Sequence, residues 1–333
     1  MRKKMGARIV GMGSYLPEHR LTNRELETLV DTTDEWIVSR TGILERRIAA
    51  PNEFTSDMGV KASLAALQEA QLQPGEIDLV ITATMTPDFT SSSTAAIIQA
   101  KIGAERAAAF DIQAACTGFV YALSMAKAYV ESGLYGRVLV VAAEKMSAFI
   151  DYTDRSTCIL FGDGAAAAVV AAKGAGLLID AVSLGADGSL VELATIPAGG
   201  ARQPPSAQSV AERLHYFRMD GREVFKHAVR KMSGAAQECL EKAGLKTTDI
   251  KWLVPHQANM RIIDAIAKGF QIPDEVVYKT VQKYGNTSAS SIPLALKDLS
   301  QEHPFAVGEH LLLAAFGAGL TWGAALLTQI SGE

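Results

Sequence analysis

Residues 110–119 read Phe110-Asp-Ile-Gln-Ala-Ala-Cys-Thr-Gly-Phe119. The apolar run over residues 107–112 is typical of a buried strand, and residues 119–131 are typical of a helix. Cys116 therefore falls in a sharp turn between a strand and a helix. Strand-like and helix-like segments also alternate before and after this stretch, which indicates an α/β protein with a mostly parallel sheet.

The predicted segments follow the same order in both halves of the chain. Strands are expected at residues 77–82, 107–112 and 138–142, and again at 250–254, 276–281 and 311–315. Helices are expected at residues 261–270 and 292–299, and a loop at residues 199–208. We therefore predict two related lobes, residues 1–174 and 175–333.

Composition narrows the classes of function. The chain has 333 residues, of which 48% are apolar and only 20% are charged, so we expect a large buried interface, as in an obligate homodimer. A net charge of −4 without alternating basic and aromatic residues argues against nucleic-acid binding. The longest apolar run, residues 165–172, is too short to span a bilayer, so no membrane insertion is expected.

The three cysteines are Cys116, Cys158 and Cys239. Their number and wide spacing argue against a disulfide framework and against a zinc site. No apolar segment typical of a signal peptide follows the N-terminus. We therefore expect a protein of the reducing cytoplasm.

Cys116 is the candidate nucleophile. At the N-terminus of a helix, exposed N–H groups and the helix dipole lower the pKa of a thiol, and the thiolate is the reactive form. The alternative is that Cys116 is a small buried apolar residue, as most free cysteines are. The local sequence does not separate these two interpretations.

Two further strand-to-helix turns carry polar side chains that suit catalysis. His256 lies in Trp252-Leu-Val-Pro-His-Gln-Ala-Asn259, where it would act as a base or a donor, or serve only structure. Asn286 lies in Lys283-Tyr-Gly-Asn-Thr-Ser-Ala-Ser290, where it would donate to an oxyanion or only form a turn. The run Phe316-Gly-Ala-Gly-Leu-Thr-Trp-Gly323 allows close backbone approach to a ligand, or forms a tight turn between strands. Matching strand ends in α/β folds are where such groups meet.

The whole chain resembles the β-ketoacyl-acyl-carrier-protein synthase III enzymes of bacterial fatty acid synthesis, in the thiolase superfamily. The motifs that carry the resemblance, in chain order, are Gly11-Met-Gly-Ser-Tyr-Leu-Pro17, Asp31-Thr-Thr-Asp-Glu-Trp-Ile37, Arg40-Thr-Gly-Ile43, Ala114-Ala-Cys-Thr-Gly118, Phe161-Gly-Asp-Gly164, Val254-Pro-His-Gln-Ala-Asn259, Gly285-Asn-Thr-Ser288 and Thr321-Trp-Gly323. The resemblance implies a thiolase-like fold of two duplicated lobes in α-β-α-β-α layers.

The resemblance also implies a two-step reaction without a metal or redox cofactor. Cys116 would take the acyl group from an acyl-CoA primer, acetyl-CoA or longer, and CoA would leave. Malonyl-acyl-carrier protein would then lose CO2, while His256 and Asn286 donate hydrogen bonds to the enolate. The carbanion would attack the acyl thioester, whose oxygen would be held by the N–H groups of Cys116 and Ala318.

Further residues match the family's substrate contacts. For CoA these are Thr32, Trp36, Arg40, Arg155 and Asn259, with Trp36 and Arg155 expected on either side of the adenine. For the carrier protein they are Gln257, Ala258, Asn259, Met260 and Arg261. Lys226 and Lys268 would extend this basic surface, or belong to ordinary solvated surface.

The chain departs from the family pattern at two positions. Many members have three glycines after Phe316, whereas the middle one here is Ala318, whose N–H is kept as long as its φ is not strongly positive. Some members place a bulky aromatic residue near position 91, which reaches across the dimer to shorten the acyl pocket formed with Phe316. Ser91 stands there, so we expect room for a primer longer than acetyl, unless Phe89 turns in.

Several alternatives remain at this stage. A papain-like protease also uses Cys, His and Asn, but its local cysteine signature is missing here. A degradative thiolase needs a second cysteine in the last glycine-rich turn, and here that turn has none. Elongating synthases use two histidines, whereas this chain has His256 and Asn286. Condensing enzymes of polyketide or quinolone synthesis share Cys, His and Asn and differ mainly in substrate. A non-catalytic acyl-CoA-binding protein is the third class.

Overall fold

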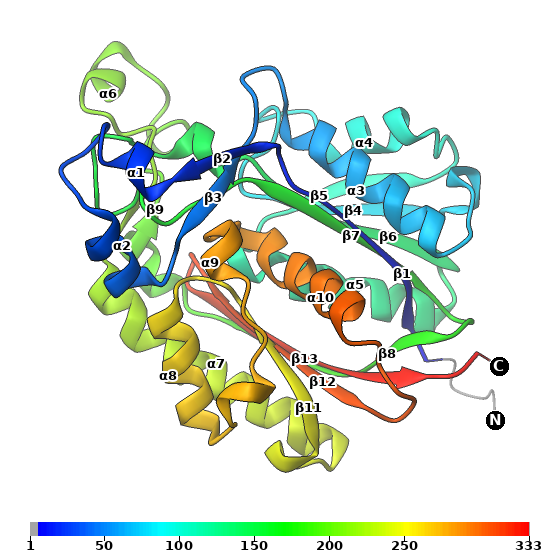
Figure 1. Ribbon diagram of the computed structural model, residues 1–333. Coiled ribbons are helices and arrows are strands. Elements are labelled where there is room, and N and C mark those ends of the chain that lie inside the picture. Colours follow the sequence, from blue (N-terminus) through cyan, green and yellow to red (C-terminus); the bar gives the residue numbers. More distant parts are fainter. Residues whose placement is uncertain (1–5, 333) are drawn as a thin grey trace.

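The computed structural model describes residues 6–332, and its main element is one nine-stranded sheet (Figure 1). The strands follow the order β11-β12-β13-β8-β1-β7-β6-β4-β5. Their bounds are β1 (Arg8–Tyr15), β4 (Leu79–Ala83), β5 (Ala108–Ile112), β6 (Arg137–Glu144), β7 (Gly164–Ala171), β8 (Gly176–Ala186), β11 (Ile250–Pro255), β12 (His310–Gly317) and β13 (Thr321–Ile330).

The sheet consists of two halves that repeat one pattern. In the first half β4 pairs in parallel with β5 and β6, and then β7 and β1 follow in antiparallel orientation. In the second half β11 pairs in parallel with β12, and then β13 and β8 follow in antiparallel orientation. The halves join where β1 pairs with β8, and the predicted boundary at residues 174 and 175 lies between β7 and β8. The division into two lobes stays a prediction.

The expectation of a mostly parallel sheet is wrong. Only the pairs β4–β5, β4–β6 and β11–β12 are parallel, so the sheet is mixed. The reason is that β7 and β13 return directly beside the preceding strands β6 and β12 without a crossover helix. Apolar periodicity identifies buried strands, but it carries no information on their direction.

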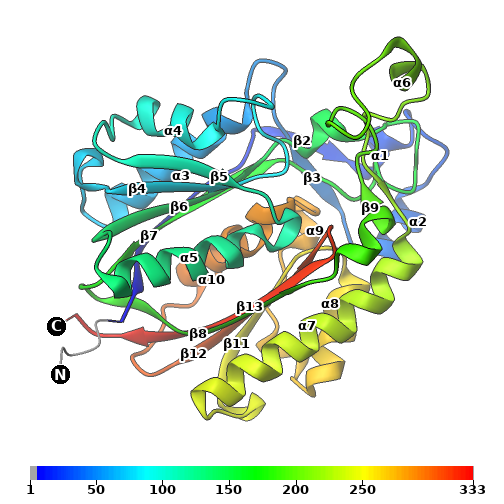
Figure 2. The same cartoon turned by 180° about the vertical axis from the view of Figure 1, so that it is seen from behind.

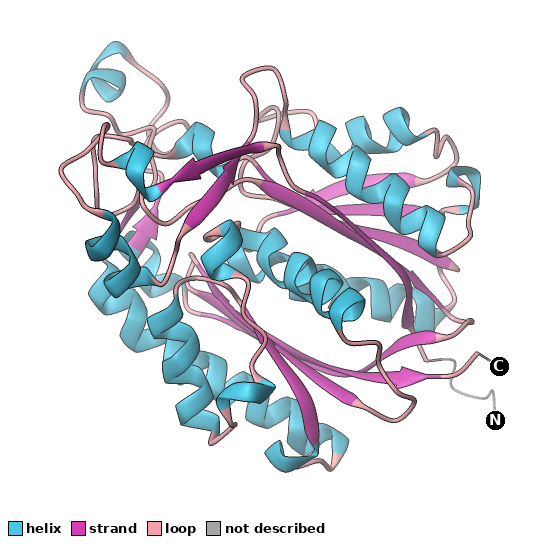
Figure 3. Ribbon diagram, viewed as in Figure 1, coloured by secondary structure: helices cyan, strands magenta, loops and turns pink. Residues whose placement is uncertain are grey.

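Helices cover both faces of the two halves and give five layers (Figure 2, Figure 3). The outer helices α3 (Thr55–Glu69) and α4 (Thr94–Ile102) contact the first half, and α7 (Gly221–Ala243) contacts the second half, with α8 (Met260–Phe270) beside it. Between the halves lie α5 (Gly118–Ser132) and α10 (Ser291–Glu302), which contact strands of both. The α-β-α-β-α layering expected from the resemblance is thus confirmed.

The middle layer requires small residues where its helices begin. A Cβ at Gly118 would lie 2.9 Å from the Cβ of Ala83 and 3.3 Å from the Cβ of Ala289. Farther along, α5 buries Phe119 and Leu123 completely. These contacts hold the N-terminus of α5, and with it the turn of Cys116, between the ends of both half-sheets.

The strand predicted at residues 276–281 is absent. Its place beside β11 corresponds to that of β5 beside β4, but it forms a single parallel bridge, from Val277 to Leu253. After Tyr278 the backbone turns, because the N–H groups of Thr280 and Val281 donate to the side chain of Gln257 at 2.8 and 3.1 Å. The side chain of Gln257 thus accepts the backbone hydrogen bonds that a neighbouring strand would otherwise accept.

The other predicted segments are confirmed within about three residues, with one difference in the loop at residues 199–208. That loop ends in helix α6, which begins at Ala207, because the Ser206 side chain caps it. The apolar run 165–172 forms the buried strand β7. Within residues 6–332 no helix is long and apolar enough to cross a membrane.

Shorter elements complete the described chain. The strands are β2 (His19–Thr22), β3 (Glu45–Ile48), β9 (Ala194–Thr195) and β10 (Arg218–Met219). The helices are α1 (Asn23–Leu26), α2 (Asp34–Thr41), α6 (Ala207–Ala211) and α9 (Val281–Tyr284). The 3-10 segments are η1 (Pro74–Glu76), η2 (Ala115–Thr117), η3 (Met146–Phe149), η4 (Gly188–Leu193), η5 (Thr247–Asp249), η6 (Asp274–Val276) and η7 (Ser288–Ser290).

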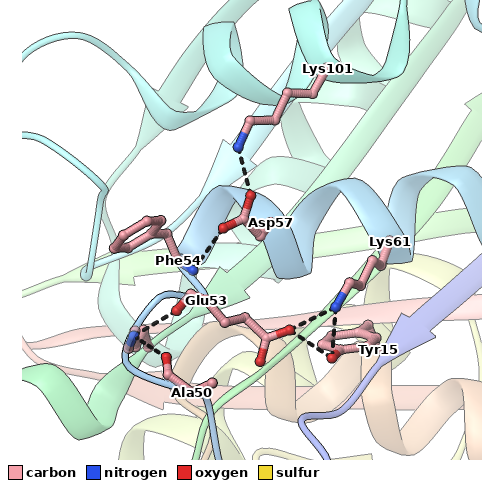
Figure 4. A network of polar contacts seen from close by, with 8 residues as sticks. Tyr15, Ala50, Glu53, Phe54, Asp57, Lys61 and Lys101 are labelled. Carbon is pink, nitrogen blue, oxygen red and sulfur yellow. Dashed lines mark hydrogen bonds and ion pairs between the residues drawn. The ribbon is translucent and has the colours of Figure 1, made fainter.

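A polar network fixes the loop before α3 (Figure 4). Lys61 Nζ donates to Tyr15 Oη at 2.8 Å and to Glu53 Oε1 at 2.7 Å. From the end of β6, Lys145 Nζ donates to the carbonyl groups of Ala50 and Glu53 at 2.9 and 2.6 Å. The ammonium group of Lys145 is therefore occupied by this loop.

Candidate active site

A cavity of about 660 Å³ opens where the strand ends of the two halves meet. The predicted site residues that line it are Cys116, His256, Asn286, Phe316, Ala318, Trp36, Arg40, Ala258, Asn259, Arg261 and Lys226. Those that do not line it are Thr32, Arg155, Gln257, Met260, Ser91 and Lys268. The three residues proposed for chemistry thus share one cavity.

Cys116 is placed by the turn between β5 and α5. It lies in η2 (Ala115–Thr117), which leads directly into α5 at Gly118, so it stands at a strand-to-helix turn as the sequence predicted. The hairpin between β12 and β13 packs onto this turn, because a Cβ at Gly317 would lie 2.9 Å from the N atom of Cys116 and 3.0 Å from the O atom of Ala114. Only glycine at position 317 allows these backbones to come so close.

The surroundings of the Cys116 thiol oppose its ionisation. Burial raises the pKa of the thiol to about 12, and the negative charge of Glu144 acts in the same direction. The hydrogen bond from Sγ to Ser288 Oγ, at 3.6 Å, acts the other way, more than the charge of Glu144 but less than burial. The backbone N–H of Cys116 does lower the pKa of the thiol, in the direction predicted for a helix N-terminus, but desolvation is the larger effect, so the net pKa is raised and not lowered.

His256 is a neutral histidine at the end of β11. Its backbone N–H donates to the carbonyl of Ala314 at 2.8 Å, and its ring Nδ1 lies 2.6 Å from Ser291 Oγ. Only 3% of the residue is exposed, and burial lowers the pKa of the imidazole to about 3. With Nδ1 engaged, Nε2 is the ring nitrogen left to act in the cavity.

Asn286 is held so that its amide nitrogen stays available. Its backbone N–H donates to Leu160 O at 2.8 Å, and its Oδ1 accepts from the N–H of Ser288 at 2.9 Å. Gly285 before it has φ 64°, and a Cβ there would lie 2.7 Å from Leu160 O. The Nδ2 group has no acceptor among the hydrogen bonds within residues 6–332, so Asn286 has the form of a donor.

The hairpin that carries Ala318 keeps the geometry that a main-chain donor needs. Ala318 is not among the described residues with positive φ, so the methyl group adds no backbone strain. Thr321 Oγ1 bridges the hairpin to the Cys116 turn, through Ala114 O at 3.1 Å and Thr117 Oγ1 at 3.0 Å. These contacts hold the hairpin that carries Ala318 onto the Cys116 turn, and Ala318 has no positive φ where the family pattern has glycine.

Cationic side chains gather in the outer part of the cavity. Its lining includes Arg40, Arg222, Lys226 and Arg261, of which only Lys226 has a carboxylate partner within residues 6–332, namely Glu223. Unpaired cations in a cleft favour anionic ligands. Arg222, at the start of α7, was not expected from the sequence.

Trp36 lies beside these cations in direct contact with two arginines. The guanidinium carbon of Arg155 lies 5.1 Å from the centre of the Trp36 ring, and that of Arg40 lies 5.9 Å away. Arg155 also donates to Asp31 O at 3.0 Å. An adenine between Trp36 and Arg155 would therefore first have to displace the guanidinium group.

The side chain of Gln257 has a structural role. It is buried with 1% exposure, its Nε2 donates to Pro255 O and Tyr278 O, and its Oε1 accepts two backbone N–H groups. A side chain so enclosed holds β11 to the segment that follows η6, and its contact with a carrier protein stays a prediction.

The remaining residues predicted to bind substrates differ in whether their side chains are already engaged within the protein. Asn259 caps α8 by accepting from the N–H of Ile262 at 3.0 Å, and Met260 packs against Gly42. Thr32 Oγ1 is a buried atom without a hydrogen-bond partner among the described residues. Arg261 is exposed at the start of α8 and lines the cavity.

Sequence reasoning missed three polar residues behind the reactive groups. Ser288 and Ser291 lie inside or beside the quoted Gly285-Asn-Thr-Ser288 motif, but serines in such a turn have ordinary structural roles. Glu144 lies at the end of an apolar strand, where a buried carboxyl group is itself an unusual feature. This carboxyl group at the end of an apolar strand was the feature of the sequence that could have identified Glu144.

Comparison with known proteins identifies the family. The family model described as 3-oxoacyl-[acyl-carrier-protein (ACP)] synthase III matches residues 110–188, and its C-terminal counterpart matches residues 240–329. The β-ketoacyl-[acyl-carrier-protein] synthase III of Chlamydia caviae is 55% identical over 333 residues, which cover 100% of this chain and 99% of the relative. The chain belongs to this family. It is therefore an acyltransferase of the condensing type.

Solved structures agree with this assignment. The enzyme matches 3-oxoacyl-[acyl-carrier-protein] synthase III from Aquifex aeolicus with a TM-score of 0.89 and 48% identity, over 97% of this chain and 100% of the other. The priming β-ketosynthase of the R1128 polyketide pathway matches with a TM-score of 0.90 and 40% identity, over 100% and 99% of the two chains. Higher identity to the synthase III enzymes, up to the 55% above, favours fatty acid initiation over the polyketide and quinolone alternatives.

Proposed function

We propose that this enzyme starts fatty acid synthesis through an acyl thioester on Cys116. The reaction is the condensation of an acyl-CoA primer with malonyl-acyl-carrier protein, giving 3-oxoacyl-acyl-carrier protein, CoA and CO2. One observation carries the site assignment: a thiol, a neutral imidazole and a free carboxamide line the same cavity. This combination suits transfer of an acyl group to sulfur and stabilisation of an oxyanion without a strong acid nearby.

The first half-reaction moves the acyl group to the enzyme. Cys116 Sγ attacks the thioester carbonyl carbon, and the resulting oxyanion is held by the N–H groups of Cys116 and Ala318. The bond from carbon to the CoA sulfur then breaks, and CoA leaves as a thiol with the proton that Cys116 gave up. The close packing of Gly317 on the Cys116 turn supports this pairing of donors, because it brings the two backbones together.

The second half-reaction forms the carbon–carbon bond. The malonyl thioester loses CO2, and its carbonyl oxygen gains negative charge as the enolate forms. His256 Nε2 and Asn286 Nδ2 donate to that oxygen, and the α-carbon attacks the acyl-Cys116 carbonyl. The bond from the acyl carbon to Cys116 Sγ then breaks, which releases 3-oxoacyl-acyl-carrier protein and a thiolate that takes up a proton. Burial of His256 supports this role, because a neutral imidazole donates a hydrogen bond without giving up its proton.

The basic outer cavity suits the phosphates of CoA and an acidic carrier protein. Arg40 and Arg222 lie near Trp36 and α7 without carboxylate partners in the described chain, and Arg261 is exposed at the start of α8. We assign Arg40, Trp36, Arg155, Thr32 and Asn259 to CoA, and Arg261, with Ala258 and Met260, to the carrier protein. Substitution Arg261→Glu should raise KM for malonyl-carrier protein at least tenfold and leave acyl transfer from acyl-CoA unchanged. Lys268→Glu, with the same change of charge outside the cavity on the same helix, is the matched control.

The outer edge of β5 supports a homodimer. β5 ends the sheet, so its second edge has no strand partner within residues 6–332, and an open edge of a partly apolar strand favours pairing with another chain. Asp111 of this strand accepts from the N–H groups of Thr94 and Ala95, both at 2.7 Å, which holds the end of the segment that contains Ser91 at the same edge. Light scattering of the purified enzyme should give twice the mass of the chain.

We expect no metal or redox cofactor, because decarboxylation drives the condensation. The three cysteines are free, which is compatible with the cytoplasm as the place of action.

Intact-protein mass spectrometry tests the proposal. After mixing with acetyl-CoA, the enzyme should gain one acetyl group, and Cys116→Ala should gain none. Cys116→Ser should also lose turnover, whereas a protein that merely binds acyl-CoA would keep its binding and show no covalent mass. Retention of the acetyl group by Cys116→Ala would contradict the assignment of the nucleophile.

A further inference from the structure

Glu144 is a buried carboxyl group that the reaction described above does not use. It is the last residue of β6 and has 0% exposure. Its Oε2 accepts from Thr84 Oγ1 at 3.1 Å and from Thr86 Oγ1 at 2.7 Å, and the N–H of Met85 donates to both carboxylate oxygens. A carboxylate removed from water needs such donors, yet its position beside the reactive thiol is not explained by them.

Ser288 connects this carboxylate to the thiol. Cys116 Sγ donates to Ser288 Oγ at 3.6 Å, and Ser288 Oγ donates to Glu144 Oε1 at 3.1 Å. Both hydrogen bonds run in the same direction, from the thiol to the carboxylate. Ser288 has φ 51°, and its N–H is held by Asn286 Oδ1, so the hydroxyl group is fixed between its two partners.

We propose that Glu144 receives the proton of Cys116 through Ser288 when the thiol attacks the acyl-CoA. The thiol proton passes to Ser288 Oγ as the Ser288 hydroxyl proton passes to Glu144 Oε1, which leaves a thiolate and a neutral carboxyl group. When the carbon–sulfur bond of the acyl-CoA breaks, the proton returns through Ser288 to the departing CoA sulfur. Glu144 is then ionised again, and charge and protons balance. This inference rests on the proposed acylation of Cys116.

The electrostatics of the pair agree with such a transfer. A thiol whose pKa is raised to about 12 supplies almost no thiolate at neutral pH, so it needs a proton acceptor. Burial raises the pKa of Glu144 to about 7, which makes it a far better acceptor than an exposed carboxylate. Its titration therefore lies closer to neutral pH than that of an exposed carboxyl group.

Few charges face this pair. Glu144 meets only hydroxyl and N–H groups from the turn after β4 (residues 84–86) and from η7, and it is connected to the Cys116 thiol of η2 through Ser288. Lys145 is turned away to the carbonyl groups of residues 50–53, and Asp163 is engaged by Ala49 and Ser147. A titration near pH 7 in the acylation step is therefore assigned to Glu144.

The pH dependence of acylation separates this role from a structural one. The rate of acetyl transfer from acetyl-CoA to the enzyme is measured by rapid quench and intact mass between pH 5.5 and 9. In the native enzyme the rate should rise through pH 7 and then level off. In Ser288→Ala it should fall about 100-fold at pH 7, in the range of general base catalysis, and keep rising to pH 9 without a plateau.

Two controls keep the test decisive. Ser290→Ala removes a neighbouring buried hydroxyl that donates to Gly164 O and Thr287 O, and should leave rate and profile unchanged. Glu144→Gln should reproduce the profile of Ser288→Ala. If that variant does not fold, because it loses several acceptor contacts, Ser288→Ala alone decides.

Two results would overturn the inference. One is a rate in Ser288→Ala within twofold of the native rate, and the other is a slower rate that keeps its inflection near pH 7. In both cases Cys116 would still carry the acetyl group, so the proposed function would stand. Absence of the acetyl group from the native enzyme would instead refute the proposed function.

Discussion

Nδ1 of His256 lies 2.6 Å from Oγ of Ser291. The same Oγ accepts from the N–H of Gln257 at 3.3 Å, which directs the hydroxyl proton of Ser291 towards Nδ1. The ring proton of the neutral imidazole is then placed on Nε2, the nitrogen left for the cavity. Ser291 therefore favours the tautomer that the proposed role of His256 as a donor to the enolate requires.

This relationship predicts a selective defect in Ser291→Ala. Without the hydroxyl group, the proton is free to move to Nδ1, and Nε2 loses its donor capacity. Release of CO2 from malonyl-carrier protein should slow about tenfold, while acetyl transfer to Cys116 stays within twofold of the native rate. Ser290→Ala is the control, and equal loss in both steps would exclude a role in setting the tautomer.

His256 and Asn286 should themselves separate the two half-reactions. Both are assigned as donors to the enolate, so His256→Ala and Asn286→Ala should reduce decarboxylation about 100-fold or more. Acetylation of Cys116 should change far less in His256→Ala, because His256 does not hydrogen-bond the thiol within the described structure. Asn286→Ala also removes the oxygen that holds the Ser288 N–H, so a moderate loss of acetylation, smaller than the loss of decarboxylation, is expected there. Trapping of ¹⁴CO2 and intact mass measure the two steps, and comparable losses in both would contradict the assignment.

The sequence predicted the site better than the sheet. Each turn that carries Cys116, His256 or Asn286 follows a strand-like segment, and the structure brings all three to one cavity. The direction of β7 and β13 and the missing strand after Pro273 were not predictable, because they depend on hairpins and on the side chain of Gln257. Apolar periodicity reports burial but not strand direction or partners.

The pKa of Cys116 and the charge beside it were also not predictable from the sequence. The helix N-terminus predicted a lowered pKa for Cys116, whereas burial and Glu144 raise it. Glu144 is 28 residues after Cys116 in the chain, and only the parallel pairing of β4 with β5 and β6 brings it to the same strand ends. Contacts between such distant residues arise from topology, which a single sequence does not specify.

Substitution of Gly317 should impair acetyl transfer, whereas substitution of Ala318 by glycine should not. In Gly317→Ala the new Cβ would meet Cys116 N at 2.9 Å and Ala114 O at 3.0 Å, so the hairpin must move away from the Cys116 turn. We expect kcat/KM for acetyl transfer to fall at least 100-fold. Ala318→Gly keeps the N–H and adds no atom, so its kcat/KM should stay within threefold. A tolerant Gly317→Ala variant would show that the two turns need not touch.

The buried neutral state of His256 makes stability depend on pH. Its pKa is about 3 in the folded protein, against 6.5 for a histidine in water, so the unfolded chain binds the proton first as the pH falls. The contribution of His256 to the free energy of unfolding is therefore complete above pH 6.5 and is lost as the pH falls towards 3, at about 1.4 kcal/mol per pH unit.

Urea unfolding of the native protein and of His256→Gln isolates this contribution. Carboxyl groups, including Glu144 with its opposite dependence, are common to both proteins and cancel in the difference. Between pH 6.5 and 4.5 the stability of the native protein relative to the variant should fall by about 2 kcal/mol. A difference that stays constant over this range would show that His256 is not buried in its neutral form.

The segment that contains Ser91 should set the length of the primer. Ser91 is exposed and does not line the cavity of its own chain, while the neighbouring Phe89 is 60% exposed, so neither fills that cavity. If a second copy pairs at the edge of β5, residue 91 meets the partner's acyl pocket, and a serine leaves it open. We therefore expect kcat/KM to stay within tenfold from acetyl-CoA to hexanoyl-CoA.

An aromatic side chain at this position should close the pocket. Ser91→Phe should reduce kcat/KM for hexanoyl-CoA at least tenfold and leave the value for acetyl-CoA within threefold, because only the longer chain reaches the added ring. Ser92→Phe places the same ring one residue farther along the exposed segment and serves as the control. A native enzyme whose kcat/KM collapses beyond acetyl-CoA would show that Phe89 turns in and takes the place of the missing aromatic residue.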